Sequence, residues 1–343
     1  MLRLVQLIHE DEGRRVAVVE EPLLRPLARW RSVYDLAQEA ITAGLGIVEV
    51  VAADTFLASL DYDAVYEGRS PWRLLPPIDH PEEPGRCMVS GTGLTHKASA
   101  ENRQSMHVSS RVGSAHQTEP AEPLTDSMKM YRIGLEGGRP AEGQIGAAPE
   151  WFYKGCGAIL KTHGESLVVP SFADDGGDEA EIAGAYLIGP GGIPYRIGLV
   201  QGNEFSDHVT ESRNYLYLAP SKLRQCAIGP ELVVGADFTE VPGQIRIQRG
   251  DDVMWQAPIT SGDKAMSHSL ANLEHHHFKF DAHRRAGDVH VHFFGADHFS
   301  FRDRVRLEDG DVMAVSFQNF GRPLRNPLQI DRAPPALVAA RAL

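Results

Sequence analysis

Two glutamates placed two positions apart are the first feature of the sequence that could do chemistry. Glu179 and Glu181 begin an apolar segment with the pattern of a strand, in the stretch GGDEAEIAGAYLIGP. Residues i and i+2 of a strand point to the same face, so these two carboxylates could converge on one hard cation. A third oxygen ligand could come from Glu204 or Asp207, which follow the strand-like segment YRIGLV. Acidic residues at a strand edge are also commonly only solvated, so the spacing alone leaves both interpretations open.

Histidines form a second possible metal-binding group. Three consecutive histidines, 275–277, precede the segment HVH, in which His290 and His292 would share one face of a strand. Together with Glu274 they could form a cupin-like site for a transition metal. Adjacent histidines of a helix point in different directions, however, so at most two of the three could reach one ion. We therefore predict that these histidines are structural, either buried or at an interface.

Two lysines lie in turn-like settings, Lys154 in PEWFYKGCG and Lys222 in APSKLRQCAIGP. A lysine held in a cleft can bind a substrate carboxylate, polarise a carbonyl group or form a Schiff base. Most lysines are simply solvated. The glycine-rich stretches GLEGG and GPGG match neither a P-loop nor a dinucleotide-binding fingerprint, so the sequence does not support nucleotide binding.

The elements that must position these side chains begin with a compact β-β-α unit. Residues 2–8 and 15–19 have the pattern of short strands around the turn DEG. The segment that follows places apolar residues at helical spacing between Val33 and Ile41. We predict a small N-terminal domain over residues 1–75.

Five prolines between residues 71 and 86 exclude a long helix there and mark the crossing into the main body of the protein. After residue 85, short β-rich runs alternate with Gly, Asp and Pro turns. The clearest later helix is SHSLANLEHHHFKF, with Ser267 or Ser269 as its N-cap. The predicted fold class is therefore α+β and β-rich, with a small N-terminal α/β domain and a catalytic domain over residues 85–335.

The composition is that of a globular protein: 42% of the 343 residues are hydrophobic and 23% are charged. The net charge of −12 argues against nucleic acid or an anionic membrane surface as a partner. Three cysteines fit a reducing compartment and cannot form a disulfide framework. The amino terminus lacks the apolar core of a signal peptide, and no run approaches the roughly 20 apolar residues of a spanning helix. We predict a soluble, cytoplasmic protein.

Six short motifs between residues 90 and 328 resemble, in the same order, those of the fumarylacetoacetate hydrolase superfamily. The family's P-E-x-x-x-K-G is similar to PEWFYKG, its E-x-E to EAE at 179–181, and its N-D element to NE at 203–204. Its later motif, S/A-K followed by G-P, is similar to SK at 221–222 followed by GP at 229–230. AGDVHVHFFGA stands where the family has a P-G-D-x-x-x-T-G-T turn, with Ala296 in place of the threonine, and FGRPLRNP resembles its closing motif.

This resemblance implies a mixed β-sandwich/β-roll catalytic fold, usually a homodimer, that binds Mg²⁺ or Mn²⁺ and acts on a small 2-oxo acid. Carried over residue by residue, it makes Glu179, Glu181 and Glu204 the metal ligands. Glu204 departs from the more common Asp at its position, so Asp207 could take part instead. The positions implied for substrate contacts are Asn203, Ser206, Asp207, His208 and Gln225.

A second departure from the family pattern lies in the lid segment GLTHKASAENR. Hydrolytic members activate water with a His and a Glu three residues later, whereas His96 is followed by Glu101 five residues on. Five residues correspond to about 140° around a helix, so the two side chains would not share a face. The resemblance then favours the branch of 2-keto-3-deoxy sugar acid dehydratases, which lack this pair.

We therefore predict a Mg²⁺-dependent dehydratase that converts a 2-keto-3-deoxy-pentonate to 2,5-dioxopentanoate in non-phosphorylating pentose degradation. Lys154 or His96 is predicted to carry the proton transfers, and Lys222 to hold the substrate carboxylate or polarise its 2-oxo group. One alternative is a C–C hydrolase of an acylpyruvate or a 2,4-diketo-3-deoxy sugar acid. A second alternative is an inactive sugar-acid-binding regulator.

Overall fold

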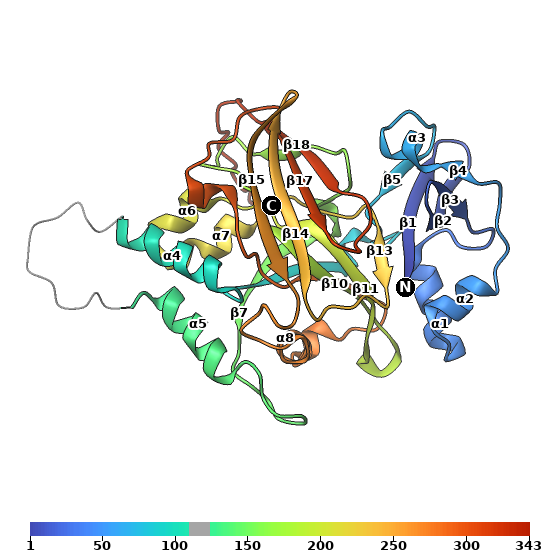
Figure 1. The fold of residues 1–343 in the computed structure, drawn as a ribbon, viewed down its shortest axis with the longest axis horizontal. Helices are drawn as coiled ribbons and strands as arrows, with labels where there is room; N and C mark the ends of the chain where they lie inside the picture. The colour runs from blue at the N-terminus through green and yellow to red at the C-terminus, as the bar shows by residue number, and fades with distance from the viewer. Residues whose placement is uncertain (110–123) are drawn as a thin grey trace, which may run out of the picture.

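The computed structural model describes residues 1–109 and 124–343, and this part of the chain is a strand-rich mixed α/β fold with two sheets (Figure 1). The strands are β1 (Leu2–His9), β2 (Gly13–Glu20), β3 (Leu23–Pro26), β4 (Leu60–Asp61), β5 (Arg73–Leu75), β6 (Cys87–Gly93), β7 (Glu150–Cys156), β8 (Leu160–Lys161), β9 (Leu167–Val169), β10 (Ala180–Ile188), β11 (Pro194–Asn203), β12 (Cys226–Ile228), β13 (Leu232–Val234), β14 (Val241–Arg249), β15 (Asp252–Ser261), β16 (Val289–Phe293), β17 (Val312–Phe317) and β18 (Leu324–Ile330). The α-helices are α1 (Val33–Ala43), α2 (Ile47–Ala52), α3 (Tyr62–Tyr66), α4 (Lys97–Ser109), α5 (Asp126–Gly137), α6 (His208–Arg213), α7 (Leu218–Lys222) and α8 (Leu270–Phe278).

The larger sheet has the strand order β4-β3-β2-β1-β13-β11-β10-β16-β6-β7. Its N-terminal strands continue the sheet that carries β10 and β11, because β1 pairs antiparallel with β13, Leu4 opposite Leu232. The strands and the helix predicted for the N-terminal unit are confirmed as β1, β2 and α1. The division into domains at residues 1–75 and 85–335 stays a prediction.

Helix α1 forms for reasons that the sequence shows. The Ser32 hydroxyl accepts a hydrogen bond from the Asp35 amide at the N-terminus, and Gly44 ends the helix in the left-handed conformation, with φ +66°. Its buried face, which includes Val33 and Leu36, packs in one core cluster with residues of β10 and β16 such as Leu187. The helix therefore covers the larger sheet beside the N-terminal strands.

The smaller sheet has the strand order β15-β14-β17-β18-β9. Ile245 of β14 and Val315 of β17 are fully buried in one cluster with Ile182 of β10 and Leu199 of β11, so this sheet packs on the larger one. Strand β10 is buried along all nine residues, which explains its near-continuous apolar sequence. The finer assignment to a sandwich or a roll stays a prediction.

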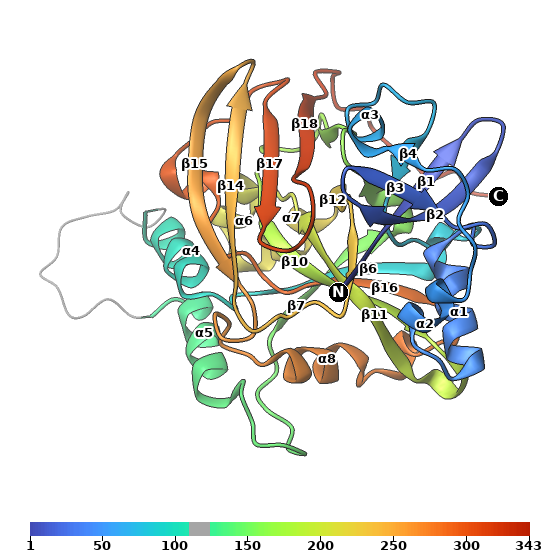
Figure 2. The same ribbon diagram turned by 45° about the vertical axis from the view of Figure 1, so that its right-hand side comes forward.

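Helices α4 and α5 lie at the end of the molecule opposite α1 and the N-terminal strands in both views (Figures 1 and 2). The helix predicted in SHSLANLEHHHFKF is confirmed as α8, and Ser269 is its N-cap, with its side chain accepting from the Asn272 amide. The described helices are all too short or too polar to cross a membrane.

Candidate metal centre and active site

Three buried glutamates converge where β10 begins and β11 ends. These strands are antiparallel neighbours with Ala180 opposite Asn203, so Glu179, just before β10, lies beside Glu204, just after β11. The Glu204 amide donates to the Glu179 carbonyl over 2.8 Å, which fixes this approach. One carboxylate oxygen from each of Glu179, Glu181 and Glu204 lies within 4.8 Å of the other two. The structure thus brings together the three predicted metal ligands.

The electrostatics of this group suit a divalent cation. Burial and the negative charges of Glu204 and Glu179 raise the pKa of Glu181 well above its usual value. Burial also raises the pKa of Glu204, against the opposing charges of Lys154 and Lys222. Three hard oxygen donors that repel one another are the ligand set that Mg²⁺ or Mn²⁺ uses in proteins, so the residues fit such an ion.

Lys222 joins two of the three carboxylates. Its Nζ donates to Glu179 Oε1 and to Glu204 Oε2, each over 2.6 Å, and to Ser206 Oγ over 2.9 Å. Burial opposes the charged form, but the carboxylates of Glu179 and Glu204 outweigh it and raise the pKa of Lys222. Lys222 therefore stays an ammonium group within reach of the candidate ligands, as the prediction of a substrate-binding or catalytic lysine requires.

Lys154 has a different environment from the one predicted for a proton carrier. Its Nζ donates to the backbone carbonyls of Phe205 (2.7 Å) and Lys222 (3.1 Å) and forms an ion pair with Glu204 Oε1 at 2.6 Å. The side chain is fully buried. These contacts make Lys154 a clamp that holds Glu204 and its neighbouring backbone in place.

Two further predicted residues contact the carboxylates directly. The ring nitrogen Nε2 of His208 lies 3.0 Å from Glu179 Oε1, and Ser206 donates to Glu204 Oε2 over 3.0 Å. Although burial works against its charged form, the hydrogen bond and charge of Glu179 raise the pKa of His208. Both side chains belong to the site.

The other residues predicted to contact substrate have supporting positions. Asn203 Oδ1 accepts from the backbone amides of Glu179 and Phe205, so it shapes the turn. Asp207 lies outside the carboxylate group: it caps α6 by accepting from Thr210 and pairs with Arg224. The interpretation that Asp207 replaces Glu204 is therefore wrong.

Gln225, like Asp207, makes its hydrogen bond outside the carboxylate group. Its Oε1 accepts from the backbone amide of Val168 on β9, over 2.9 Å. The physical reason is its location before the short strand β12, where the side chain supplies an acceptor to an amide of β9, the edge strand of the smaller sheet.

His96 lies at the start of the lid helix α4 and is 2% exposed. The Thr95 hydroxyl donates to the Phe294 carbonyl over 2.7 Å, so it must accept the 2.9 Å hydrogen bond from His96 Nδ1. The other ring nitrogen, Nε2, is then unprotonated, and it is buried without a hydrogen-bond partner among the described residues. Burial lowers the pKa of His96 to about 4.

Glu101 does not approach His96. It is exposed on the outer side of α4, where it pairs with Lys97 at 3.6 Å. The prediction that these two residues cannot form the water-activating pair of the hydrolases is confirmed by this arrangement.

The histidine group has hydrogen-bond partners within the protein. Trp151 donates to Nδ1 of His277 over 3.1 Å, and Nε2 of His277 lies 2.9 Å from Nδ1 of His290. His292 lies between the hydroxyls of Ser90 and Thr92, each 2.9 Å from a ring nitrogen. These contacts support the structural interpretation of the histidines.

Four residues near the site received no role from the sequence. The Gly295 amide donates to Glu181 Oε2 over 2.7 Å, and Arg103 forms ion pairs with Glu150 and Glu211. Gly295 and Glu150 lie inside two of the quoted motifs, which was a usable signal. Arg103 ends the quoted lid segment GLTHKASAENR, where only His96 and Glu101 were considered, and Glu211 lies in no quoted motif.

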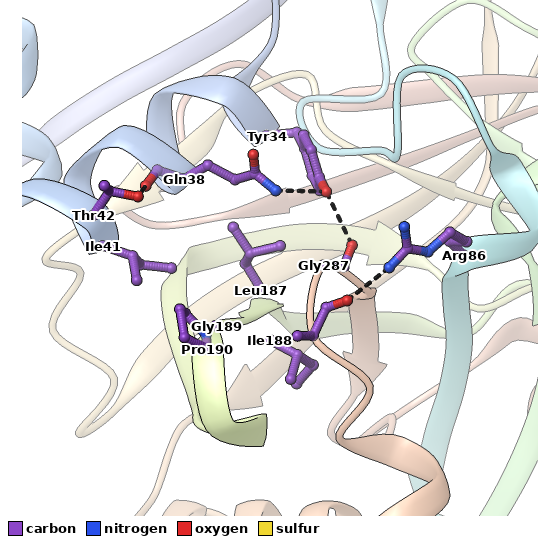
Figure 3. Close-up of a pocket in the computed structure, with 11 residues that line it drawn as sticks. Tyr34, Gln38, Ile41, Thr42, Arg86, Leu187, Ile188, Gly189, Pro190 and Gly287 are labelled. Carbon is purple, nitrogen blue, oxygen red and sulfur yellow. Dashed lines mark hydrogen bonds between the residues drawn. The ribbon is translucent and has the colours of Figure 1, made fainter.

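A cavity of about 470 Å³ lies elsewhere, between α1 and the turn after β10 (Figure 3). Tyr34, Gln38 and Arg86 line its polar side, and Ile41 and Leu187 line its apolar side. It includes none of the residues predicted for catalysis or metal binding. The chemistry therefore belongs to the carboxylate group and not to this cavity.

The sequence matches no family model and no curated protein. Solved structures do match. A 2-keto-3-deoxyarabinonate dehydratase is 18% identical with a TM-score of 0.70, and the match covers 96% of this chain and all of the dehydratase. A 2-keto-3-deoxy-D-arabinonate dehydratase complexed with magnesium and 2,5-dioxopentanoate gives the same identity and coverage with a TM-score of 0.69. A 5-carboxymethyl-2-hydroxymuconate delta-isomerase from Mycobacterium smegmatis is 15% identical, with a TM-score of 0.56 and coverage of 96% and 100%. This chain thus has the fold of these enzymes, as the motif resemblance predicted.

Proposed function

We propose that the protein is a Mg²⁺-dependent dehydratase that removes water from a 2-keto-3-deoxy-pentonate to give 2,5-dioxopentanoate. The observation that carries the proposal is the buried group of Glu179, Glu181 and Glu204 beside Lys222. Support comes from the shared fold, since one protein of that fold is a dehydratase complexed with magnesium and 2,5-dioxopentanoate. Assembly as a homodimer and a location in the cytoplasm stay predictions.

Glu179, Glu181 and Glu204 are the residues that would hold the ion. When bound, Mg²⁺ supplies Lewis-acid polarisation of the substrate's 2-oxo group. Dehydration then requires the chain to take a proton from C3 and to give one to the hydroxyl that leaves C4 as water. Removal of a proton from C5 and protonation of C3 then give an enol with a C4–C5 double bond, which tautomerises to the C5 aldehyde as its O–H proton moves to C4.

His96 is the side chain best suited to accept a proton. Thr95 fixes its tautomer so that Nε2 carries a free lone pair, and burial keeps the ring neutral. The same segment packs on the turn that contacts the metal ligands, because Thr95 bonds Phe294 and the next residue, Gly295, bonds Glu181. This arrangement supports the predicted role of His96.

Lys222 is the side chain best suited to donate a proton or to hold the substrate carboxylate. Its three N–H groups meet Glu179, Glu204 and Ser206, and this support for an ammonium group beside the candidate metal ligands favours that assignment. Lys154 is assigned to hold Glu204, since two of its three partners are backbone carbonyls. This assignment replaces our sequence-based choice of Lys154 as a proton carrier.

The test is to incubate the protein with 2-keto-3-deoxy-D-arabinonate and Mg²⁺ and to detect 2,5-dioxopentanoate with a semialdehyde dehydrogenase. We expect product only with the metal present, and little cleavage of acylpyruvates. Rapid cleavage of an acylpyruvate without water elimination from any deoxy sugar acid would establish the C–C hydrolase instead. Tight binding of the sugar acid without turnover would establish the regulator.

A further inference from the structure

We propose that Arg103 is a positioning residue that seats the lid helix α4 on the carboxylates of Glu150 and Glu211 and so fixes His96. The catalytic role of His96 rests on the proposed function. The seating of the helix itself does not depend on it.

The contacts of Arg103 are those of a buried latch. Its Nη1 donates to both oxygens of Glu150, over 2.7 and 2.9 Å, and its Nε lies 2.7 Å from Glu211 Oε1. The side chains of Arg103, Glu150 and Glu211 are 8, 2 and 3% exposed. One guanidinium group thus joins two buried carboxylates, and hydrogen bonds between charged partners at this depth are strong.

Arg103 supplies the positive charge that both carboxylates need. Among the ion pairs of the described residues, Glu150 and Glu211 pair with Arg103 alone, and Glu150 also accepts from the hydroxyl of Tyr215 over 2.9 Å. If α4 moved away, two buried carboxylates would lose their cationic partner. Because an unpaired buried charge is costly, this arrangement strongly favours the seated helix.

Because α4 runs continuously from Lys97 to Arg103, the position of Arg103 also determines the position of His96. His96 directly precedes α4, and Arg103 lies seven positions further on, about two turns and 10.5 Å along the helix axis. Ala100, one turn before Arg103 and on the same face, is fully buried, and its amide donates to the His96 carbonyl. Glu101 faces solvent on the other side. A shift of Arg103 would therefore move His96 with it.

The two receiving carboxylates belong to elements that build the active site. Glu150 begins β7, the strand that carries Lys154, and Glu211 lies in α6, which begins at His208. Lys154 contacts Glu204, and His208 contacts Glu179. The latch thus ties the lid to the two elements that hold the candidate metal ligands.

The experiment compares hydrogen exchange of the backbone amides of residues 97–104 with steady-state kinetics. The variants are Arg103→Met, which removes the charge, and Arg103→Lys, which keeps it. We expect Arg103→Met to accelerate exchange by about tenfold or more, and to lower kcat more than it raises KM, because His96 is displaced. Arg103→Lys should restore part of both. Arg249→Met is the matched control, since Arg249 makes a similar two-oxygen pair with Asp311 beside the smaller sheet.

A second variant keeps the test sound if Arg103→Met fails to fold. Glu211→Gln weakens the same seat from α6 without changing α4, and it should also accelerate exchange in residues 97–104. Unchanged exchange in the folded variants would overturn the latch whatever the activity. Accelerated exchange in a protein that dehydrates no deoxy sugar acid would support the latch and overturn the proposed function, so the two failures are distinguishable.

Discussion

Lys222 Nζ lies 2.6 Å from Glu204 Oε2 in an ion pair whose two side chains are no more than 1% exposed. Lys154 contacts the other oxygen of the same carboxylate. Two ammonium groups therefore meet Glu204, whereas Glu181, whose pKa is raised well above its usual value by burial and by Glu204 and Glu179, has no ion pair among the described residues. A divalent cation held by the three glutamates would supply the countercharge that Glu181 lacks.

Lys222→Met should lower kcat for 2-keto-3-deoxy-D-arabinonate by about 10²- to 10⁴-fold, the usual contribution of a proton-transfer group. Steady-state kinetics at saturating Mg²⁺ measure this loss. Lys161→Met is the control, because Lys161 forms only a surface pair with Glu165 at 3.6 Å. Full turnover by Lys222→Met would show that the proton comes from another group.

Mg²⁺ should raise the melting temperature of the protein, because the ion relieves the repulsion among the three glutamates. At a free concentration of 100 times Kd, the gain in unfolding free energy is about 2.7 kcal/mol. Glu181→Gln should reduce this gain and weaken binding in titration calorimetry, whereas Glu142→Gln, at an exposed position, should change neither. Equal Mg²⁺ affinity of Glu181→Gln and the unaltered protein would remove Glu181 from the site.

Stability should fall steeply as the pH drops below about 6.5, the usual pKa of histidine. Burial lowers the pKa of His290 and of His292 to about 3. Between pH 6.5 and 3 the unfolded chain binds protons that the folded chain does not, so each histidine removes about 1.4 kcal/mol per pH unit on acidification. In denaturant unfolding across this pH range, the unfolding free energy of His292→Gln should fall less steeply on acidification than that of the unaltered protein. His275→Gln, at an exposed position, should follow the unaltered protein.

Gly295→Ala should abolish most of the activity and destabilise the protein. Gly295 has φ +102°, and an added Cβ would collide with the Thr95 hydroxyl. The collision would displace the amide that donates to Glu181 and the hydroxyl that orients His96. Gly310→Ala is the matched control, since Gly310 has φ +89° but open space around it. Backbone strain should lower the thermal stability of both alanine variants, because both glycines have positive φ. Damage to the site should lower kcat only for Gly295→Ala.

The site residues that could be predicted from the sequence are those that lie close together along the chain or within a recognisable motif. Glu179 and Glu181 share a strand face by simple alternation, and the ordered motifs added Glu204 from a neighbouring strand. Arg103 could not be assigned in this way, because its partners Glu150 and Glu211 lie 47 and 108 positions along the chain. Only the folded arrangement of α4, β7 and α6 brings the three together.

The role of each lysine also depended on tertiary contacts. Lys154 and Lys222 both occupy motif positions, and nothing in their neighbours indicates which one meets backbone carbonyls and which one meets carboxylates. The fold class followed from patterns that are local: alternating apolar residues, proline-rich crossings and the Ser269 cap. The pairing of β1 with β13, between segments more than 200 residues apart, had no such signal.

The continuity of the larger sheet through β1 and β13 has a consequence for how this chain can be divided. Removing the N-terminal segment would leave β13 with an open edge of unpaired backbone groups. A strand of another molecule could then pair with this edge. It would also strip the buried carboxylate of Glu231 of its two N-terminal partners, Arg3 and Tyr62. The first strand therefore acts as a cap against self-association for the sheet that carries the active site.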